Sequence, residues 1–332
     1  MKNEFKGLMV RETDGVFTPK VEQISVTEIP KNEVLIKVAY SSVNYKDALS
    51  ASGNKGVTRK YPHIPGIDAA GEVISSTSDG ITEGDNVIVT GYDLGMNTWG
   101  GFGEYVSVPA NWVIKLPKGL SLFESMCLGT AGLTAGLSIY NLINSGIGKS
   151  QGKIVVSGAT GGVGSISIGI LSKLGYDVVA ISGKKEDHFI NQVLGASAII
   201  SREEFIDIYD QKPMSKADYS GGVDTVGGSI LSGMLKSLKY NGVVTTCGNV
   251  ASAEISTSIF PFILRGIKLI GIDSVEQPIE FKSEIWTLLA QEWKPTHLNE
   301  MVKEISIERL PDVLSTILQG NARGRFVVNH TF

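Results

Sequence analysis

Residues 153–164, with the sequence KIVVSGATGGVG, have the composition of a nucleotide-binding turn between a strand and a helix. Ala159, Gly161 and Gly164 follow the G-x-G-x-x-G spacing, with alanine in the first place. Small residues are needed there because a dinucleotide pyrophosphate must approach the backbone and accept hydrogen bonds from N–H groups at the helix N-terminus. A plain strand-to-helix turn is the alternative, since the chain has 39 glycines. We expect the pyrophosphate to contact Gly161, Gly162, Val163, Gly164 and Ser165.

The end of the next apolar run, residues 177–182, indicates which dinucleotide binds. An NAD site places an acidic residue about 20 positions after the central glycine, where it binds the ribose 2′-hydroxyl. Here that position is Ser182, and Gly183, Lys184 and Lys185 follow it. A hydroxyl and two ammonium groups can bind a 2′-phosphate. We therefore predict NADP(H); the alternative is that both lysines are only solvated charges at a helix start.

The turn lies in a region where strands and helices alternate, which is typical of a doubly wound parallel sheet. The strands expected there are 153–157, 177–182, 198–200, 222–226, 242–247 and 267–272. The first 120 residues contain short β-branched runs and predict a barrel-like antiparallel domain. These runs are 7–12, 33–44, 67–75 and 86–90. A length of 332 residues fits two domains. The predicted fold class is α/β, a β-rich barrel domain plus a parallel-sheet domain.

Composition argues against several classes of partner. The chain has 34 acidic and 30 basic residues, for a net charge of −4, which does not favour nucleic acid or an anionic membrane. Cys127 and Cys247 lie too far apart in sequence to form a CxxC pair. The uncharged run 125–148 carries five glycines, so we expect a buried helix rather than a membrane span. The N-terminus has no apolar stretch of signal-peptide length, and we predict a cytoplasmic protein.

Five sequence blocks together resemble the YhdH/YhfP group of quinone oxidoreductase-like proteins in the medium-chain dehydrogenase/reductase superfamily. They are 41–49, 64–71, 128–135, 224–228 and 261–266, the last followed by 271–275. The resemblance extends over essentially the whole chain. It implies a GroES-like catalytic domain at 1–124, completed by about 297–332, and a Rossmann NADP-binding domain at 125–296. It also implies a homodimer that pairs through a sheet edge, for which 267–272 is the candidate strand.

The same resemblance indicates an enzyme without zinc. Zinc alcohol dehydrogenases of the superfamily have Cys-His in the first block, Gly-His-Glu in the second and cysteine in the third. Here these places hold Asn44-Tyr45, Gly66-Ile67-Asp68 and the region around Thr130. The chain also lacks the four closely spaced cysteines of a structural zinc site. We expect no metal, and packing or surface roles for the scattered histidines His63, His188, His297 and His330.

The resemblance also implies roles for single residues. Tyr45 is expected to contact the nicotinamide and orient the substrate, with Asn44 and Asp47 as further catalytic candidates. The alternative is that Asn44 caps the next helix, Tyr45 packs and Asp47 is a solvated charge. Further expected cofactor contacts are Thr130, Arg202 at the 2′-phosphate, and Gly248, Ile263, Arg265 and Ser274 near the nicotinamide. Arg323 and Arg325 could contact a phosphate of coenzyme A or lie on the surface.

Hydride transfer to a conjugated acceptor is the chemistry that these expectations favour. Without a Lewis acid to polarise an alcohol or carbonyl, the acceptor must already be electrophilic. An acrylyl-CoA-type enoyl thioester and a quinone both qualify as the small-molecule substrate, and the sequence does not separate them. The alternative is an NADPH-binding redox sensor or structural protein with little turnover.

Overall fold

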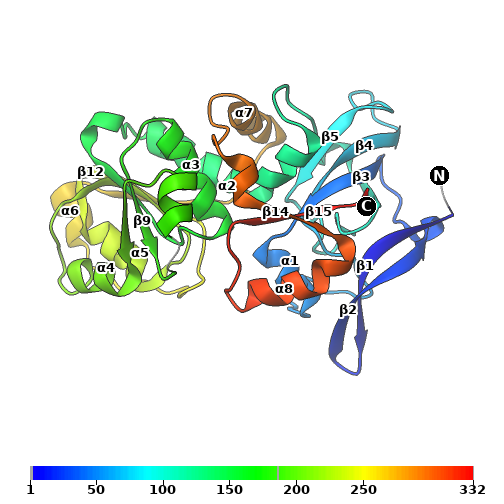
Figure 1. Cartoon of the computed structure of the whole chain (residues 1–332), viewed down its shortest axis with the longest axis horizontal. Coiled ribbons are helices and arrows are strands. Elements are labelled where there is room, and N and C mark those ends of the chain that lie inside the picture. Colours follow the sequence, from blue (N-terminus) through cyan, green and yellow to red (C-terminus); the bar gives the residue numbers. More distant parts are fainter. Residues whose placement is uncertain (1–2, 185–186, 332) are drawn as a thin grey trace. The chain divides into compact units, whose positions relative to one another are not determined.

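The computed structural model describes residues 3–184 and 187–331 (Figure 1), which form two compact units. Unit 1 comprises residues 1–130, 275–290 and 302–332, and unit 2 comprises 131–274 and 291–301. The predicted ranges had placed 125–130 and 275–290 with the parallel-sheet domain. Residues 275–290 group with unit 1 because Lys282, on the helix at 279–290, donates hydrogen bonds to the carbonyl oxygens of Thr90 and Val275.

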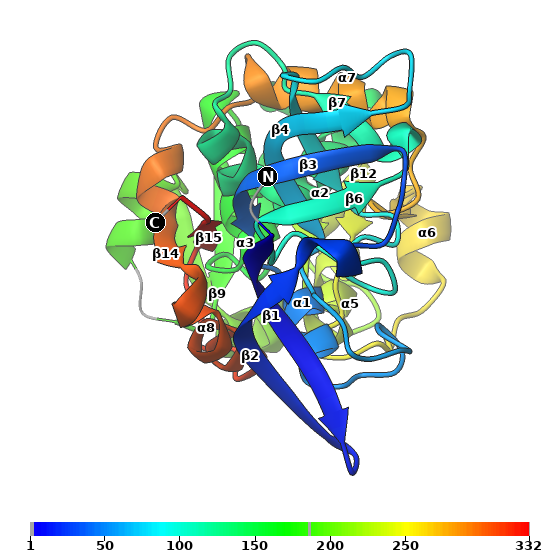
Figure 2. The ribbon, with the colours of Figure 1, turned by 90° about the vertical axis from the view of Figure 1, so that its right-hand side faces the viewer.

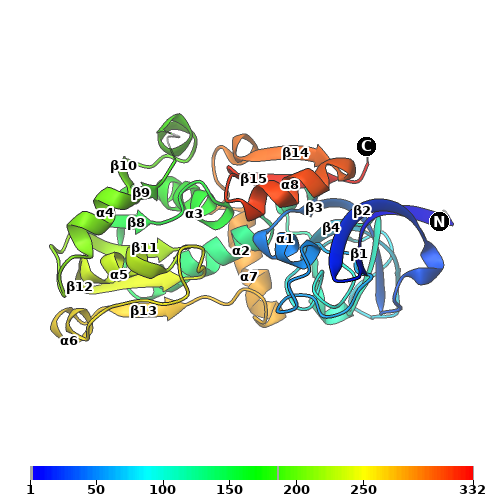
Figure 3. The same cartoon turned by 90° about the horizontal axis from the view of Figure 1, so that it is seen from below.

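Unit 2 is built on a six-stranded sheet in the order β10-β9-β8-β11-β12-β13, and every pair of neighbours is parallel. Figure 3 shows β11 and β13 pointing the same way. The predicted Rossmann sheet is confirmed, and β13 is an edge strand as expected. The strands are β8 (Lys153–Val156), β9 (Val178–Ser182), β10 (Ala198–Ser201), β11 (Tyr219–Asp224), β12 (Leu238–Thr246) and β13 (Lys268–Gly271).

The helices of unit 2 pack on a sheet whose strands β9 and β11 are fully buried, whereas the edge strands β10 and β13 contain no buried residue. The helices are α3 (Gly162–Lys173), α4 (Arg202–Tyr209), α5 (Gly228–Lys236) and α6 (Phe260–Arg265). Phe205 of α4 and Leu231 of α5 pack in one core cluster with Val155 of β8 and Ile181 of β9. Because all six strands are parallel, the loops that follow them lie along one edge of the sheet, which we call the carboxyl edge.

Unit 1 contains a seven-stranded, mostly antiparallel sheet in the order β14-β15-β3-β4-β5-β7, with β6 also beside β3. Figure 2 shows β3 between β4 and β6. A separate hairpin pairs β1 with β2. The strands are β1 (Glu4–Thr13), β2 (Val16–Ser25), β3 (Val34–Ser42), β4 (Asp68–Ser76), β5 (Asn86–Thr90), β6 (Tyr105–Val108), β7 (Val113–Lys115), β14 (Val302–Ser306) and β15 (Arg325–Asn329).

The C-terminal segment completes unit 1 rather than unit 2. β15 inserts between β14 and β3, with Val327 opposite Ser42, so that Arg325 at the start of β15 comes close to the end of β3. The helices of this unit are α1 (Tyr45–Ala51), α7 (Ile279–Ala290) and α8 (Leu310–Leu318).

Helix α2 (Leu122–Asn144) is interrupted at Gly129, where φ is +53° and ψ is −156°. Such a backbone conformation strongly favours glycine. Within residues 3–184 and 187–331, α2 is the one helix long and apolar enough to cross a membrane by length and hydropathy. However, 78% of its most apolar window is buried inside the protein, as is usual for a core helix.

Candidate functional site

The glycine turn after β8 has the close backbone contacts that the sequence predicts. Gly158 has a φ of +61°, and a Cβ there would lie 2.2 Å from the Thr225 hydroxyl oxygen. A Cβ on Gly164 would lie 2.3 Å from the Gly158 carbonyl oxygen, so α3 starts directly against the turn. Gly161 is the N-cap of α3, and the first N–H groups of that helix have no acceptor within the helix. The Gly161 N–H donates to the Gly158 carbonyl oxygen and the Ser165 N–H to the Gly161 carbonyl oxygen, so the N–H groups left without a helical acceptor at the carboxyl edge are those of residues 162–164.

The residues predicted for a 2′-phosphate meet at the neighbouring strand ends. Ser182 ends β9, and its hydroxyl accepts a hydrogen bond from the Lys184 N–H at 3.0 Å. Arg202 begins α4, directly after β10. A Cβ on Gly183 would lie 2.8 Å from the Arg202 Nε, so the guanidinium rests on the glycine backbone. Lys185 lies outside the described residues.

Two of the later cofactor candidates also lie at the carboxyl edge. Gly248 follows β12, and a Cβ there would lie 2.1 Å from the Thr225 carbonyl oxygen. Ser274 follows β13, is buried, and accepts a hydrogen bond from the Thr134 hydroxyl at 2.8 Å. Both residues thus follow strands at the same edge of the parallel sheet as the glycine turn.

The prediction that Ile263 and Arg265 lie near the nicotinamide is wrong, because the structure places both residues at the other edge of the parallel sheet. Both belong to α6, which precedes β13 and so lies at the amino edge of the parallel sheet, opposite the glycine turn (Figure 3). The Arg265 guanidinium donates hydrogen bonds to the carbonyl oxygens of Ser215, Lys236 and Leu238. Its donors thereby fix the starts of β11 and β12, while the Ile263 side chain is exposed. The predicted strand 267–272 follows the block at 261–266 directly, and this order already indicates the amino edge of a parallel sheet.

Unit 1 contains a buried polar cluster centred on Asp68, the first residue of β4. The Asp68 carboxylate accepts hydrogen bonds from the Asn44 side-chain amide at 2.8 Å and from the Thr130 N–H at 2.8 Å. The hydroxyls of Ser42 and Thr130 donate to it as well. Asp68 has no exposed surface. A buried carboxylate with this many donors is held in one orientation.

The cation of this cluster is Arg325, which is 3% exposed. Its guanidinium donates to the Ser42 hydroxyl at 2.8 Å and to the Asn44 side-chain oxygen at 3.2 Å. It also donates to the carbonyl oxygens of Val43 and Cys127. Burial lowers the pKa of Arg325, and the charge of Asp68 opposes that shift. The expectation that Arg325 contacts a coenzyme A phosphate or lies on the surface is wrong, because its donors are used inside unit 1.

Asp47 is a second fully buried carboxylate in the same block. Its two oxygens accept hydrogen bonds from the backbone N–H groups of Asn44 at 2.7 Å and Ile67 at 2.8 Å. Burial, together with the charge of Asp68, raises the pKa of Asp47 to about 7. The alternative of a solvated charge at Asp47 is therefore wrong, and its carboxylate joins the start of α1 to the segment before β4.

Tyr45 is the accessible member of the first block. It is the first residue of α1, with Asn44 as N-cap, and its side chain is 47% exposed. Asn44, by contrast, directs its amide to Asp68 and its side-chain oxygen to Arg325. Of the three predicted catalytic residues, Tyr45 is thus the one with a substantially accessible side chain.

Sequence reasoning did not assign roles to Ser42, Asp68 and Arg325 as a cluster. A signal for two of them exists: Asp68 directly precedes the small residues 69–71 and Arg325 directly precedes the apolar residues 326–328, and charged residues are rarely fully buried unless paired. The places compared with zinc ligands, Asn44, Asp68 and Thr130, are hydrogen-bonded to one another. Among residues 3–184 and 187–331, no three His, Cys, Asp or Glu side chains come together as a metal site.

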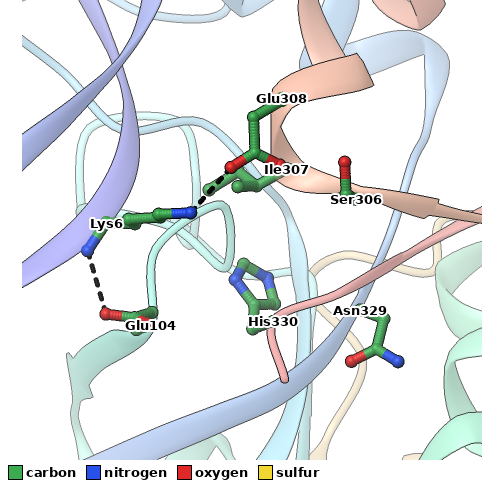
Figure 4. A pocket seen from close by; sticks show the side chains of 7 residues that line it. All are labelled: Lys6, Glu104, Ser306, Ile307, Glu308, Asn329 and His330. Carbon is green, nitrogen blue, oxygen red and sulfur yellow. Dashed lines mark hydrogen bonds and ion pairs between the residues drawn. The ribbon is translucent and has the colours of Figure 1, made fainter. Parts of the chain in front are cut away.

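A separate polar pocket in unit 1 is too small for a cofactor or acceptor. Figure 4 shows Lys6, whose backbone N–H donates to Glu104 and whose ammonium pairs with Glu308 at 2.8 Å, beside His330. Burial lowers the pKa of His330 to about 4. The cavity is about 10 Å³, which is about the space of a single water molecule.

Comparison with known proteins matches both units to dehydrogenase families. Residues 30–118 match the alcohol dehydrogenase GroES-like domain, and residues 162–291 match the family described as zinc-binding dehydrogenase. The chain is 44% identical to the putative quinone oxidoreductase YhfP of Bacillus subtilis, covering 99% of both chains. It is 37% identical to the probable acrylyl-CoA reductase AcuI of Escherichia coli, covering 97% of this chain and 99% of that protein.

Solved structures of the same group have the same fold. The crystal structure of Bacillus subtilis YhfP with NAD bound superimposes with a TM-score of 0.95 at 43% identity, covering 99% of this chain and 100% of that one. The YhdH oxidoreductase of Salmonella enterica in complex with NADP gives a TM-score of 0.94 at 36% identity, covering 98% and 99%. The GroES-like and Rossmann fold class predicted from sequence is thereby confirmed.

Proposed function

The chain belongs to the YhdH/YhfP quinone oxidoreductase-like family of the medium-chain dehydrogenase/reductase superfamily, and we propose that it is an NADPH-dependent reductase of activated double bonds. The acceptor class is an enoyl thioester of the acrylyl-CoA type or a quinone. The relatives named as acrylyl-CoA reductase and putative quinone oxidoreductase support these two classes.

The corner formed by Ser182, Gly183 and Arg202 carries the preference for NADPH. It offers a hydroxyl and a guanidinium at the end of β9, the place where an NAD site would have a carboxylate. A guanidinium binds phosphate through paired, charge-assisted hydrogen bonds. The relative YhdH was solved with NADP, whereas YhfP was solved with NAD, so the two cofactors must be compared directly.

We assign the contact with the acceptor to Tyr45. A bound nicotinamide supplies the hydride, and the protein must stabilise the charge that develops on the quinone or thioester oxygen. The exposed phenol of Tyr45 can donate a hydrogen bond to such an oxygen. Asn44 and Asp47 then act as positioning residues, because their polar atoms hold the start of α1.

We further propose that the reaction proceeds without zinc. The Arg325 guanidinium and the Asp68 carboxylate share hydrogen-bond partners where zinc alcohol dehydrogenases of the superfamily have their ligands. The buried cation that Asp68 needs is thus supplied by a side chain.

We propose a homodimer paired through β13. This strand is an edge of the parallel sheet, and α6 before it exposes a group of large apolar side chains. These are Ile259, Phe260, Ile263 and Leu264, each at least 45% exposed. An unpaired strand edge beside exposed apolar side chains is suited to a second copy of the same surface. The mass of the protein in solution, measured by light scattering, tests this proposal; a monomer at micromolar concentration would contradict it.

Initial rates of NADPH and NADH oxidation test the reductase proposal. The acceptors are acryloyl-CoA, crotonoyl-CoA and 1,4-benzoquinone, each with and without a metal chelator. Chelator-resistant, NADPH-selective turnover of acryloyl-CoA supports an enoyl reductase, and turnover of benzoquinone alone supports a quinone reductase. NADPH binding without turnover of any acceptor would contradict the proposal and favour the sensor alternative. A Tyr45→Phe variant that keeps the wild-type rate would remove Tyr45 from the mechanism.

A further inference from the structure

The sequence block at 224–228 has no role in the reaction proposed above, although its first residue is a buried carboxylate. Asp224 ends β11 at the carboxyl edge and has no exposed surface. It accepts hydrogen bonds from the Ser157 hydroxyl at 2.8 Å and the Thr246 hydroxyl at 2.9 Å. The backbone N–H groups of Val226 and Gly227 also donate to it. Four donors in a buried place hold this carboxylate firmly.

These hydrogen bonds connect three neighbouring strands. Ser157 follows β8, Asp224 ends β11 and Thr246 ends β12, so one carboxylate ties the three strand ends together. Ser157 adds two further links, because its hydroxyl accepts from the Thr225 N–H at 2.8 Å and its carbonyl accepts from the Thr225 hydroxyl at 3.0 Å. We call Ser157, Asp224, Thr225 and Thr246 the strand-end brace.

The brace contacts Gly158, in the turn that leads to the predicted pyrophosphate site, and Gly248, which is itself a predicted cofactor contact. Gly158 has space for a hydrogen but not a Cβ against the Thr225 hydroxyl, and Gly248 is equally close to the Thr225 carbonyl oxygen. A shift of Thr225 by a few tenths of an ångström must therefore move both loops. Because backbone N–H groups of the Gly158 turn would bind the pyrophosphate, their spacing depends on this contact.

We propose that Asp224 is a positioning residue for the dinucleotide: it sets the spacing of the Gly158 turn and the Gly248 loop through Thr225, without touching the cofactor. This inference rests on the proposed function, since it needs a dinucleotide at the carboxyl edge. Ser157 and Thr246 act in the same assembly as the hydroxyl donors that keep the Asp224 carboxylate in place.

Paired variants of Thr246 test the inference at a position on the far side of Asp224 from the turn. Thr246→Val keeps the shape of the side chain but removes the hydroxyl donor, whereas Thr246→Ser keeps the donor. We expect Thr246→Val to raise the Kd for NADPH about 3- to 10-fold, the scale of the net contribution of one ordinary hydrogen bond. Thr246→Ser is expected to restore most of that affinity. Thr287→Val, which makes the same chemical change on an exposed face of α7, serves as the control.

Ser157→Ala removes links to both Asp224 and Thr225 and should raise the Kd for NADPH about 10- to 100-fold. The assay is a titration of the cofactor-free full-length protein with NADPH and with NADH, followed by fluorescence, together with measurement of KM and kcat for NADPH. A positioning role raises KM and leaves kcat at saturating NADPH within about twofold. A merely structural role lowers the melting temperature but leaves the Kd of the folded protein unchanged.

The outcomes separate this inference from the proposed function. If wild-type protein binds neither NADPH nor NADH, the proposed function fails. If wild-type protein binds NADPH and both Thr246→Val and Ser157→Ala bind it equally well while folded, Asp224 does not position the cofactor. An equal loss of NADPH affinity in Thr246→Val and Thr246→Ser would also overturn the inference, because the Thr246 hydroxyl would then make no difference to cofactor binding.

Discussion

The buried carboxyl group of Asp47 in unit 1 makes the stability of the protein depend on pH in a predictable direction. Asp47 has no exposed surface and lies near the charge of Asp68, so its pKa rises from an ordinary value of 3.8 to about 7. The perturbation that isolates this group is Asp47→Asn, which cannot ionise. Its amide can accept only one of the two backbone N–H bonds that Asp47 accepts, so the variant carries a constant cost at every pH.

The sign and the size of the effect follow from linkage. A carboxyl with a raised folded-state pKa binds its proton more tightly in the folded than in the unfolded protein. Its contribution to stability is complete below about pH 4 and is lost as the pH rises to about 7. At about 1.4 kcal/mol per pH unit, the interval between 3.8 and about 7 corresponds to about 4 kcal/mol. Wild-type protein should therefore lose up to about this much unfolding free energy over that interval, relative to Asp47→Asn.

Urea denaturation at several pH values from 4.5 to about 8.5, followed by circular dichroism, measures this difference. The informative quantity is the wild-type minus Asp47→Asn difference in unfolding free energy, because titrations of other groups cancel in it. Asp312→Asn, a change at an exposed carboxylate on α8, is the control and should leave the slope unchanged. Parallel curves for wild-type protein and Asp47→Asn across the whole range would refute the reasoning.

Three further predictions concern Arg325, Arg202 and Gly129. Arg325→Met should lower the unfolding free energy measured by urea denaturation by about 3–5 kcal/mol, since it leaves buried carboxylates without their cation. Adding Asp68→Asn should recover part of this loss; if the losses of the two single variants simply add in the double variant, the pairing of Arg325 with Asp68 is contradicted. Arg202→Ala should raise the Kd for NADPH about 10- to 100-fold in fluorescence titration and leave the Kd for NADH within about twofold. An equal loss of affinity for both cofactors would exclude the 2′-phosphate as the ligand of Arg202. Gly129→Ala should destabilise the protein by at least about 2 kcal/mol in thermal denaturation, because φ at Gly129 is +53° and a Cβ there would meet buried polar atoms. The control is Gly80→Ala, whose Cβ would lie in open space and which should change stability by less than about 0.5 kcal/mol.

The nucleotide-binding half of the protein could be read from sequence because its determinants are local. The glycine turn, Ser182 and the strand that ends there lie within 30 residues of one another, and apolar runs with glycine turns mark each strand. Even Gly248 and Ser274 fall at the predicted edge, since residues that follow parallel strands must meet there. The prediction failed at Arg265, which lies before a strand rather than after one, so its block belongs to the opposite edge.

The polar cluster of unit 1 could not be predicted in the same way, because its members are distant in sequence. Asp68 and Arg325 are 257 positions apart, and only the pairing of β15 with β3 brings them together. The burial of Asp47 could not be predicted either. Its neighbours in sequence do not show whether its carboxylate accepts two hydrogen bonds from backbone N–H groups or lies in solvent. Non-local strand pairing sets the first outcome, and the contact of α1 with the segment before β4 sets the second; composition and periodicity encode neither.

The insertion of unit 2 within unit 1 has a consequence for synthesis on the ribosome. Asp68 and Thr130 emerge first, then the whole parallel sheet, and only afterwards β15 with Arg325. Until β15 arrives, the end of β3 has an unpaired edge and Asp68 lacks the guanidinium that balances its burial. Unit 2 can therefore complete its core during translation, while the nascent unit 1 stays dependent on its last strand and exposes an edge that other chains can pair with.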